Sequence, residues 1–180
     1  MASTSSSRTH SNRSGQGDSV AGQISVFQPA VGDAATLRHS FEAEPWWLPE
    51  ARPTTDGDWL VGLSWGRIRR SVVTRVGQPW AASDAVWRSL SWDPTTASTD
   101  RAARPLDRLL PAFDGEIGLH LRPDAPSLMV DGRYQPPGGD LGAAIDELAF
   151  HRVARATLQS LLGGIAHHLA PVEDPASRSA

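Results

Sequence analysis

The chain has 180 residues, of which 39% are hydrophobic, and its formal net charge is −3 at pH 7. This length fits one domain with a sizeable core, and the slightly negative charge argues against a general nucleic-acid binder. All 17 basic residues are arginine, and cysteine is absent. Catalysis by a lysine or a thiol, phosphate binding by a P-loop lysine, cysteine-ligated zinc and disulfides are therefore excluded.

The two ends of the chain differ in composition from the rest. Residues 1–20 are rich in serine and arginine, and both they and residues 171–180 contain few large apolar groups. Such segments cannot bury enough surface to offset their ordering entropy, so we expect disordered tails around one folded domain at 21–170. We find neither a hydrophobic signal region nor an apolar run near the roughly 20 residues of a membrane span. We therefore expect a cytoplasmic protein.

Between the tails, the apolar pattern predicts strands more often than helices. A first strand over 22–27 is followed by short helical turns over 37–48. Apolar residues then alternate with polar ones in five further runs, which are 59–65, 67–76, 85–92, 116–121 and 127–134. A long loop, with one helical turn near Leu109, separates the third and fourth of these runs, and the last two form a hairpin. The prediction is an antiparallel meander of about six strands.

The segment after the last strand predicts the start of a long helix. Pro136 and Pro137 lack the N–H that a sheet ladder needs, so they end the strand. Two glycines then permit a sharp reversal, and Asp140 can cap the first free helical N–H groups. No proline follows before Leu169, so we predict one helix over 140–169. At about 1.5 Å per residue, it would be roughly 43 Å long.

This helix carries one broad apolar stripe with polar residues inside it. The stripe consists of Ala144, Leu148, Ala154, Leu158, Leu161, Leu162, Ile165 and Leu169. Glu147, His151 and Arg155 are spaced four residues apart, so they can touch along one helical face. Two interpretations are open. The three residues form an ion-pair row at the helix edge, or they form a polar line at a cavity mouth that orients a ligand.

The predicted elements lead to one fold class. An antiparallel sheet with one apolar face needs a cover, and the long helix is the only large predicted element that can provide it. We therefore predict an α+β fold in which a curved antiparallel sheet grips one long C-terminal helix, with short helices after the first strand. A sheet curved around a helix can enclose space for a ligand.

Several segments resemble a known family. They are VDGRYQPPGGDLGAAIDELAFHRVARATLQSLLGGIAHHL at the C-terminal end, WWLPEA upstream, and SLSWDP and LLPAFDGEIGLHL between them. Over about 22–169, the chain resembles actinobacterial members of the START-like, helix-grip superfamily (SRPBCC). The resemblance implies a small domain that holds a hydrophobic ligand, such as a lipid or a polyketide-like molecule, between sheet and helix. It also implies relatives among lipid-transfer proteins and polyketide cyclases.

Candidate ligand-binding residues come from the strands and the helix. All seven tryptophans lie between 46 and 92, where indoles can fill a core or stack on a ligand. Arg70 and Arg88 alternate in step with apolar residues two positions away on their predicted strands. Both should therefore point to the buried face, unless these strands are assigned one residue out of register. An inward arginine needs a carboxylate such as Glu147 or an acidic ligand group. The candidate set is Trp59, Leu63, Trp65, Arg70, Arg88, Tyr134, Glu147, His151, Arg155 and Leu158.

Two sequence patterns suggest other chemistry. Residues 62–66 spell G-x-S-x-G, the nucleophile motif of α/β-hydrolases, with Asp114 or Asp131 and then His151 following in chain order. That motif requires a helix after the serine, whereas here another strand follows, so a serine hydrolase is not expected. The six histidines lack metal-ligand spacing. We expect no metal and no cofactor, and we assign no catalytic residue.

Three functions are open at this point. The first is non-catalytic binding or transport of a small hydrophobic ligand, and the second is a cyclase- or dehydrase-like reaction in the same cavity. The third is a solid domain that acts through protein partners. Only Tyr134, Glu147 and His151 offer acid or base groups for a cavity, so binding without catalysis is favoured. The expected partner is a small hydrophobic molecule and not nucleic acid, and the oligomeric state is left open.

Overall fold

The computed structural model describes residues 22–94, 110–122, 124–136 and 147–170. In chain order, the elements are β1 (Gly22–Pro29), α1 (Ala34–Glu42), β2 (Arg52–Pro53), β3 (Trp59–Trp65), β4 (Ile68–Val76), β5 (Trp80–Ala82), β6 (Ala85–Trp92), β7 (Ala112–His120), β8 (Ser127–Gln135) and α3 (Glu147–Leu169). Both expected tails, the helical turn near Leu109 and the expected helical residues before 147 lie outside the described residues.

The strands form one antiparallel sheet. Its eight strands follow the order β1-β8-β7-β6-β4-β3-β2, with β5 paired to β6 off this path. The sheet therefore contains two strands beyond the six that the pattern predicted. The additional strands are β2, with two residues, and β5, with three, and both are too short to show an alternating pattern.

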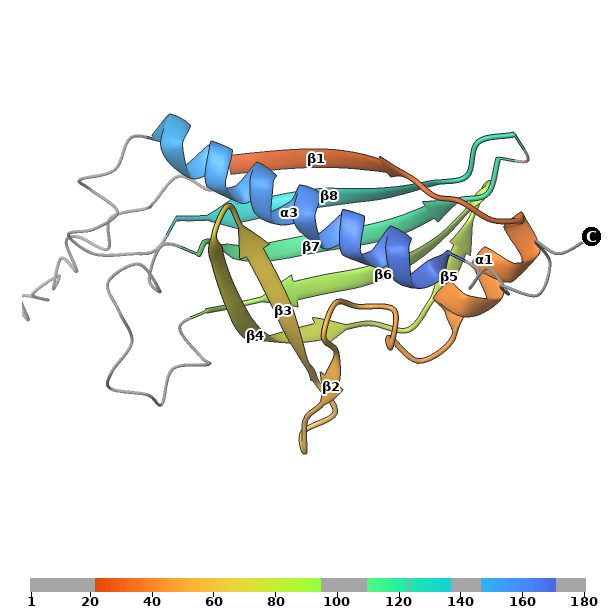
Figure 1. Ribbon diagram of the computed structural model, residues 1–180, viewed down its shortest axis with the longest axis horizontal. Coiled ribbons are helices and arrows are strands. Elements are labelled where there is room, and N and C mark those ends of the chain that lie inside the picture. The colour runs from red at the N-terminus through yellow and green to blue at the C-terminus, as the bar shows by residue number, and fades with distance from the viewer. Residues whose placement is uncertain (1–21, 95–109, 123, 137–146, 171–180) are drawn as a thin grey trace, which may run out of the picture.

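Helix α3 lies across one face of the curved sheet and contacts β1, β3 and β8 (Figure 1). Its 23 residues span about 35 Å. Short helix α1 follows β1 and packs beside the C-terminal end of α3. The predicted α+β fold, with a curved antiparallel sheet that grips a long C-terminal helix, is confirmed.

The strand pattern predicted the buried face of the sheet correctly. The four alternating residues of β3, from Trp59 to Trp65, are all buried, and so are Leu128, Val130 and Tyr134 of β8. Arg88 also points inward, as its parity with Val86 and Leu90 predicted. The face that α3 covers is called the inner face below, and the opposite face is called the outer face.

The buried face of α3 differs from the prediction at its start. Leu148 is 56% exposed, whereas Phe150 is only 2% exposed. Phe150 precedes buried Ala154 by four residues and so continues the same helical face, from which Leu148 is rotated by about 200°. The larger aromatic side chain therefore occupies the core position. The buried face consists of Phe150, Ala154, Thr157, Leu158, Leu161, Leu162, Ile165 and Leu169.

Helix α1 has a well-formed start and an apolar face. Asp33 is the N-cap, and its carboxylate accepts hydrogen bonds from the backbone N–H groups of Ala35 at 3.1 Å and Thr36 at 2.9 Å. Hydrogen bonds from the Thr36 side chain and backbone lower the pKa of the Asp33 carboxyl. Leu37 and Phe41 on the same helix are completely buried. The cap thus fixes where α1 begins, and these two side chains fix which face it buries.

The cap predicts a pH dependence. Because the folded-state pKa of Asp33 lies below its ordinary value of 3.8, ionised Asp33 stabilises the fold above that pH. This stabilisation is lost as the pH falls through the folded-state pKa. The side-chain amide of the Asp33→Asn variant can still cap the helix, but it carries no charge. From pH 6 to pH 3, wild type should therefore lose more unfolding free energy than the variant does. Urea unfolding at several pH values measures this difference, and a constant value would contradict the assignment.

The buried face of α3 predicts the effect of core truncation. Leu158 is 1% exposed, so Leu158→Ala should lower the free energy of unfolding by about 2–5 kcal/mol. The adjacent Gln159 is exposed, and Gln159→Ala should change it by no more than about 0.5 kcal/mol. Thermal and urea unfolding of both variants provide the comparison. Equal stabilities would mean that α3 does not cover the sheet as described.

Candidate functional site

One row of inner-face residues crosses the sheet, and its Tyr134 end meets the start of α3. Each member lies directly opposite the next on the neighbouring strand, and the register continues to Gly22 on β1. We call this set the aromatic row, and it consists of Trp59, Thr74, Trp92, Phe113 and Tyr134. Every side chain in it is at most 8% exposed. The row is therefore a continuous, buried and mainly aromatic band across the sheet.

The middle of the aromatic row is tightly packed. Trp92 stacks on Phe113 with ring centroids 4.7 Å apart, and its indole N–H donates to the carbonyl of Pro111 at 3.0 Å. Gly115 and Gly132 lie under the Phe113 ring, because a Cβ on either would come within 2.9 Å of its Cζ atom. The two glycines therefore allow Phe113 to lie over the sheet.

At the β8 end of the row, Tyr134 meets the helix. Its ring occupies the space that a side chain at Gly22 would need. Its hydroxyl lies 3.3 Å from Nδ1 of His151, which is half-buried near the start of α3. The hydroxyl donates if Nδ1 is unprotonated and accepts if Nδ1 carries the proton. Tyr134 and His151 thus place two polar groups against the aromatic row.

The other predicted helix residues occupy different environments. Arg155 is exposed, and the side chain of Glu147 lies outside the described residues. The partner that the structure gives His151 is Tyr134 rather than a neighbour on α3. Leu158 is deep in the core. The predicted polar line along α3 therefore reduces, in the described residues, to His151 beside Tyr134.

The predicted strand residues of the inner face are mostly core residues. Leu63 is 1% exposed, and Trp65 is 8% exposed. Trp59, at the far end of the aromatic row, makes an edge contact with exposed Trp46, with ring centroids 5.0 Å apart. Arg70 is half-buried on β4, directly opposite Leu63.

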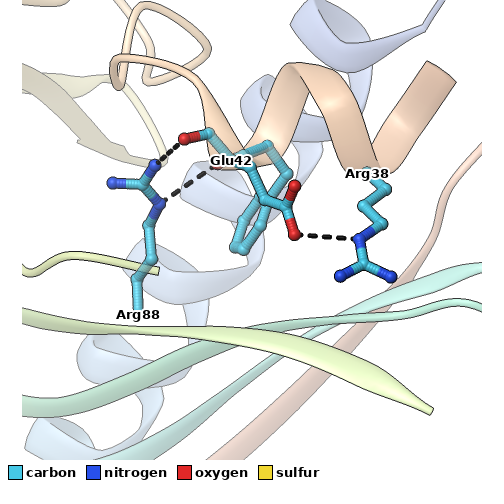
Figure 2. A network of polar contacts seen from close by, with 4 residues as sticks. Arg38, Glu42 and Arg88 are labelled. Atoms are coloured by element: carbon cyan, nitrogen blue, oxygen red, sulfur yellow. Dashed lines mark hydrogen bonds and ion pairs between the residues drawn. The ribbon is translucent and has the colours of Figure 1, made fainter. Parts of the chain in front are cut away.

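Arg88 is buried, but its partners are backbone carbonyls. Its side chain donates to Phe41 at 3.1 Å, Gly77 at 3.1 Å, Glu42 at 2.7 Å and Ala43 at 2.6 Å. Three of these carbonyls belong to the C-terminal end of α1, and Figure 2 shows Arg88 beside that end. Four hydrogen bonds use most of the five N–H donors of a guanidinium. The predicted pairing with Glu147 or an acidic ligand group is therefore replaced by a structural role.

The surroundings of Arg88 suit a buried cation. Burial lowers the pKa of its guanidinium, and the negative charge of Glu42 raises it in part. The Glu42 carboxylate itself pairs with Arg38 at 2.9 Å (Figure 2). The guanidinium carbon also lies about 6 Å from the ring centroids of Phe41 and Trp47, which allows cation–π contacts. The C-terminal end of α1, where the helix dipole is negative, also favours a cation. Arg88 thus fixes α1 to the sheet.

The G-x-S-x-G segment does not form a nucleophile elbow. Ser64 lies within β3, and Gly66, with φ of +59°, lies in the turn that leads to β4. The Ser64 hydroxyl is 2.6 Å from the hydroxyl of Ser160 on α3, so it links strand to helix. The expectation that this motif is not a hydrolase site is consistent with the strand–turn–strand geometry.

One open hollow lies away from α3. It has a volume of about 480 Å³ and borders β4, β6, β7 and β8. Its lining includes Arg75, Asp114 and Arg133 of the outer face and also Trp92 and Phe113 of the aromatic row. This lining combines charged and apolar side chains and includes no described residue of α3, so the hollow is not the cavity expected between sheet and helix. In the described part of the chain, no three His, Cys, Asp or Glu residues are grouped to hold a metal, and no helix could span a membrane.

Comparison with known proteins gives little further information. No family model and no curated protein matches the chain. Among solved structures, the chain is similar to one titled "Crystal structure of Ara h 8.0201", with a TM-score of 0.46 and 10% identity. The match covers 83% of this chain and 98% of that chain. The interpretation of the site therefore rests on the geometry above.

The role of Arg88 predicts a large effect on stability. Arg88→Met removes the donors of four carbonyls and should lower the free energy of unfolding by about 3 kcal/mol or more, because each buried group left unsatisfied costs roughly 1–3 kcal/mol. Arg88→Lys should recover only part of this loss. As a control, Arg69→Met breaks an exposed ion pair with Glu50 and should cost at most about 1 kcal/mol. Similar urea midpoints for Arg88→Met and Arg69→Met would exclude the structural role.

Proposed function

We propose that the protein binds a small hydrophobic ligand between α3 and the aromatic row. The observation that carries this proposal is the contact between Tyr134 and His151. It places a hydroxyl and an imidazole beside a surface of stacked rings. A ligand with an apolar body and one polar group matches both features. The proposal includes membership of the START-like, helix-grip superfamily, which the arrangement of sheet and helix supports.

The geometry of the polar contact favours exchange with a ligand. At 3.3 Å, the distance between the Tyr134 hydroxyl and His151 Nδ1 lies beyond the usual range for such hydrogen bonds. A long hydrogen bond is weak, so replacing it by a bond to a ligand costs little. A buried polar group without a partner is costly, so a ligand that offers a donor or acceptor is preferred over a pure hydrocarbon.

The proposed role is binding or transport, without catalysis. General acid–base chemistry on a bound molecule requires two positioned groups with suitable pKa values. Tyr134 and His151 already contact each other, which suits recognition of one polar group. The absence of lysine and cysteine from the sequence removes two further nucleophiles. We propose a cytoplasmic carrier or sensor of a lipid or polyketide-like molecule.

A titration tests this function. Fluorescent fatty acids and aromatic polyketide-like dyes should quench tryptophan emission saturably, since Trp92 and Trp59 belong to the aromatic row. His151→Leu should weaken binding of a polar-headed ligand by about 1–3 kcal/mol, the cost of a lost buried hydrogen bond. His167→Leu is the matched control, because His167 is an exposed histidine near the other end of α3. It should bind like wild type.

The alternatives give different results. A solid domain that acts only through protein partners would show no saturable binding to a broad panel of ligands. Equal affinities of wild type and His151→Leu would remove His151 from the site. Turnover of a bound polyketide-like compound, followed by mass spectrometry, would favour the cyclase-like enzyme.

A further inference from the structure

A second row of apolar residues crosses the outer face of the sheet. Its members lie directly opposite one another on β5, β6, β7, β8 and β1. We call this set the outer stripe, and it consists of Trp80, Trp87, Gly118, Met129 and Phe27. Trp80 is 39% exposed, Phe27 is 61% exposed, and Trp87 and Met129 are half-buried. The stripe faces away from α3 and contributes nothing to the site proposed above.

The centre of the outer stripe is held in place. The Trp87 indole lies over Gly118, because a Cβ on that glycine would be only 2.7 Å from its ring atoms. The ring of His120 contacts Trp87 edge-on, with centroids 5.4 Å apart. A large aromatic ring that is fixed and half-exposed offers apolar contact at a low entropic cost. Such aromatic and methionine side chains are enriched at protein interfaces.

Two carboxylates border the stripe on the same face. Glu116 on β7 lies directly opposite Asp131 on β8, two residues along each strand from Gly118 and Met129. Like charges at directly opposed positions destabilise a sheet. Within the described ranges of the chain, neither carboxylate forms an ion pair, and the nearby Arg133 lies opposite Asp114. This arrangement costs stability in the isolated chain, and a cation supplied from outside would reverse that cost.

We propose that the outer stripe binds a basic amphipathic helix of a partner protein. Five strands about 4.8 Å apart span roughly 19 Å, which matches a helix of about 13 residues. The apolar face of such a helix would cover the stripe. A lysine or arginine beside that face would meet Glu116 and Asp131, which lie about 7 Å from the stripe along the strands. The same carboxylates disfavour an anionic lipid surface.

A synthetic peptide tests the proposal on the full chain. The probe is a fluorescein-labelled 14-residue peptide of leucine and lysine with helical periodicity, and its counterpart has glutamate in place of lysine. The basic peptide should bind saturably in an anisotropy titration, and the acidic one should not. Phe27→Ser should weaken binding by about tenfold or more, as expected for an interface aromatic. The double variant Glu116→Gln, Asp131→Asn should also weaken binding and reduce its dependence on salt.

Controls distinguish binding at the outer stripe from binding elsewhere on the chain. Val31→Ser removes a side chain that is 71% exposed but outside the stripe, so it should leave the affinity unchanged. Thermal unfolding should show that each variant is folded. Binding of both peptides with equal affinity, or unchanged affinity in Phe27→Ser, would overturn the proposal. So would weaker binding in His151→Leu, which would place the peptide beneath α3. Sedimentation velocity should show a monomer, whereas a dimer that Phe27→Ser dissociates would assign the stripe to a second copy of the chain.

Discussion

The structure depends on covering the apolar inner face of a single curved sheet. An antiparallel sheet can expose one face to water, but the other must be buried against another element. Helix α3 meets most of this need with eight buried residues from Phe150 to Leu169 and contacts β1, β3 and β8, while α1 packs against β6 and buries Leu37 and Phe41. The position of α3 in turn brings His151 against Tyr134, at the β8 end of the aromatic row. The proposed site is therefore a consequence of how the sheet is covered.

Arg88 is the second constraint, and it acts on the smaller helix. A short helix such as α1 gains little stability from its own hydrogen bonds and depends on tertiary contacts. The guanidinium of Arg88 satisfies carbonyls at the end of this helix, while Leu37 and Phe41 bury its apolar face. A buried charge is tolerated here because four of its five N–H donors are hydrogen-bonded to carbonyl groups. The residue thus illustrates how a buried arginine can serve the fold rather than a ligand.

The sequence predicted the layers of the fold but not the details of the site. Strict alternation in β3 and β8 predicted their buried faces, and the absence of proline predicted the long helix. Phe113 was missed because Asp114 and Gly115 interrupt the apolar pattern after it, so the predicted strand began at 116, whereas β7 begins at Ala112. The partners of Arg88 could not be predicted, because the carbonyl of Glu42 is 46 residues away in the chain and any residue could supply it. The packing of α1 against β6 brings these distant residues together.

The tryptophans show the same limit. Their clustering between 46 and 92 suggested one set, whereas the structure places Trp46 and Trp47 between α1 and β2 and divides the other five between the two faces of the sheet. Trp59, Trp65 and Trp92 are buried on the inner face, while Trp80 and Trp87 belong to the outer stripe. One tryptophan-rich segment therefore contributes to a proposed ligand site and to a proposed protein-binding surface. Composition alone could not separate these two uses.

The most direct test of a ligand site beneath α3 is native mass spectrometry of the chain purified from its own host. A bound ligand predicts a complex with one small molecule per chain, which dissociates on activation to reveal a mass with an apolar body and a polar group. The bare chain mass alone, even after incubation with fatty acids and polyketide-like compounds, would contradict the site.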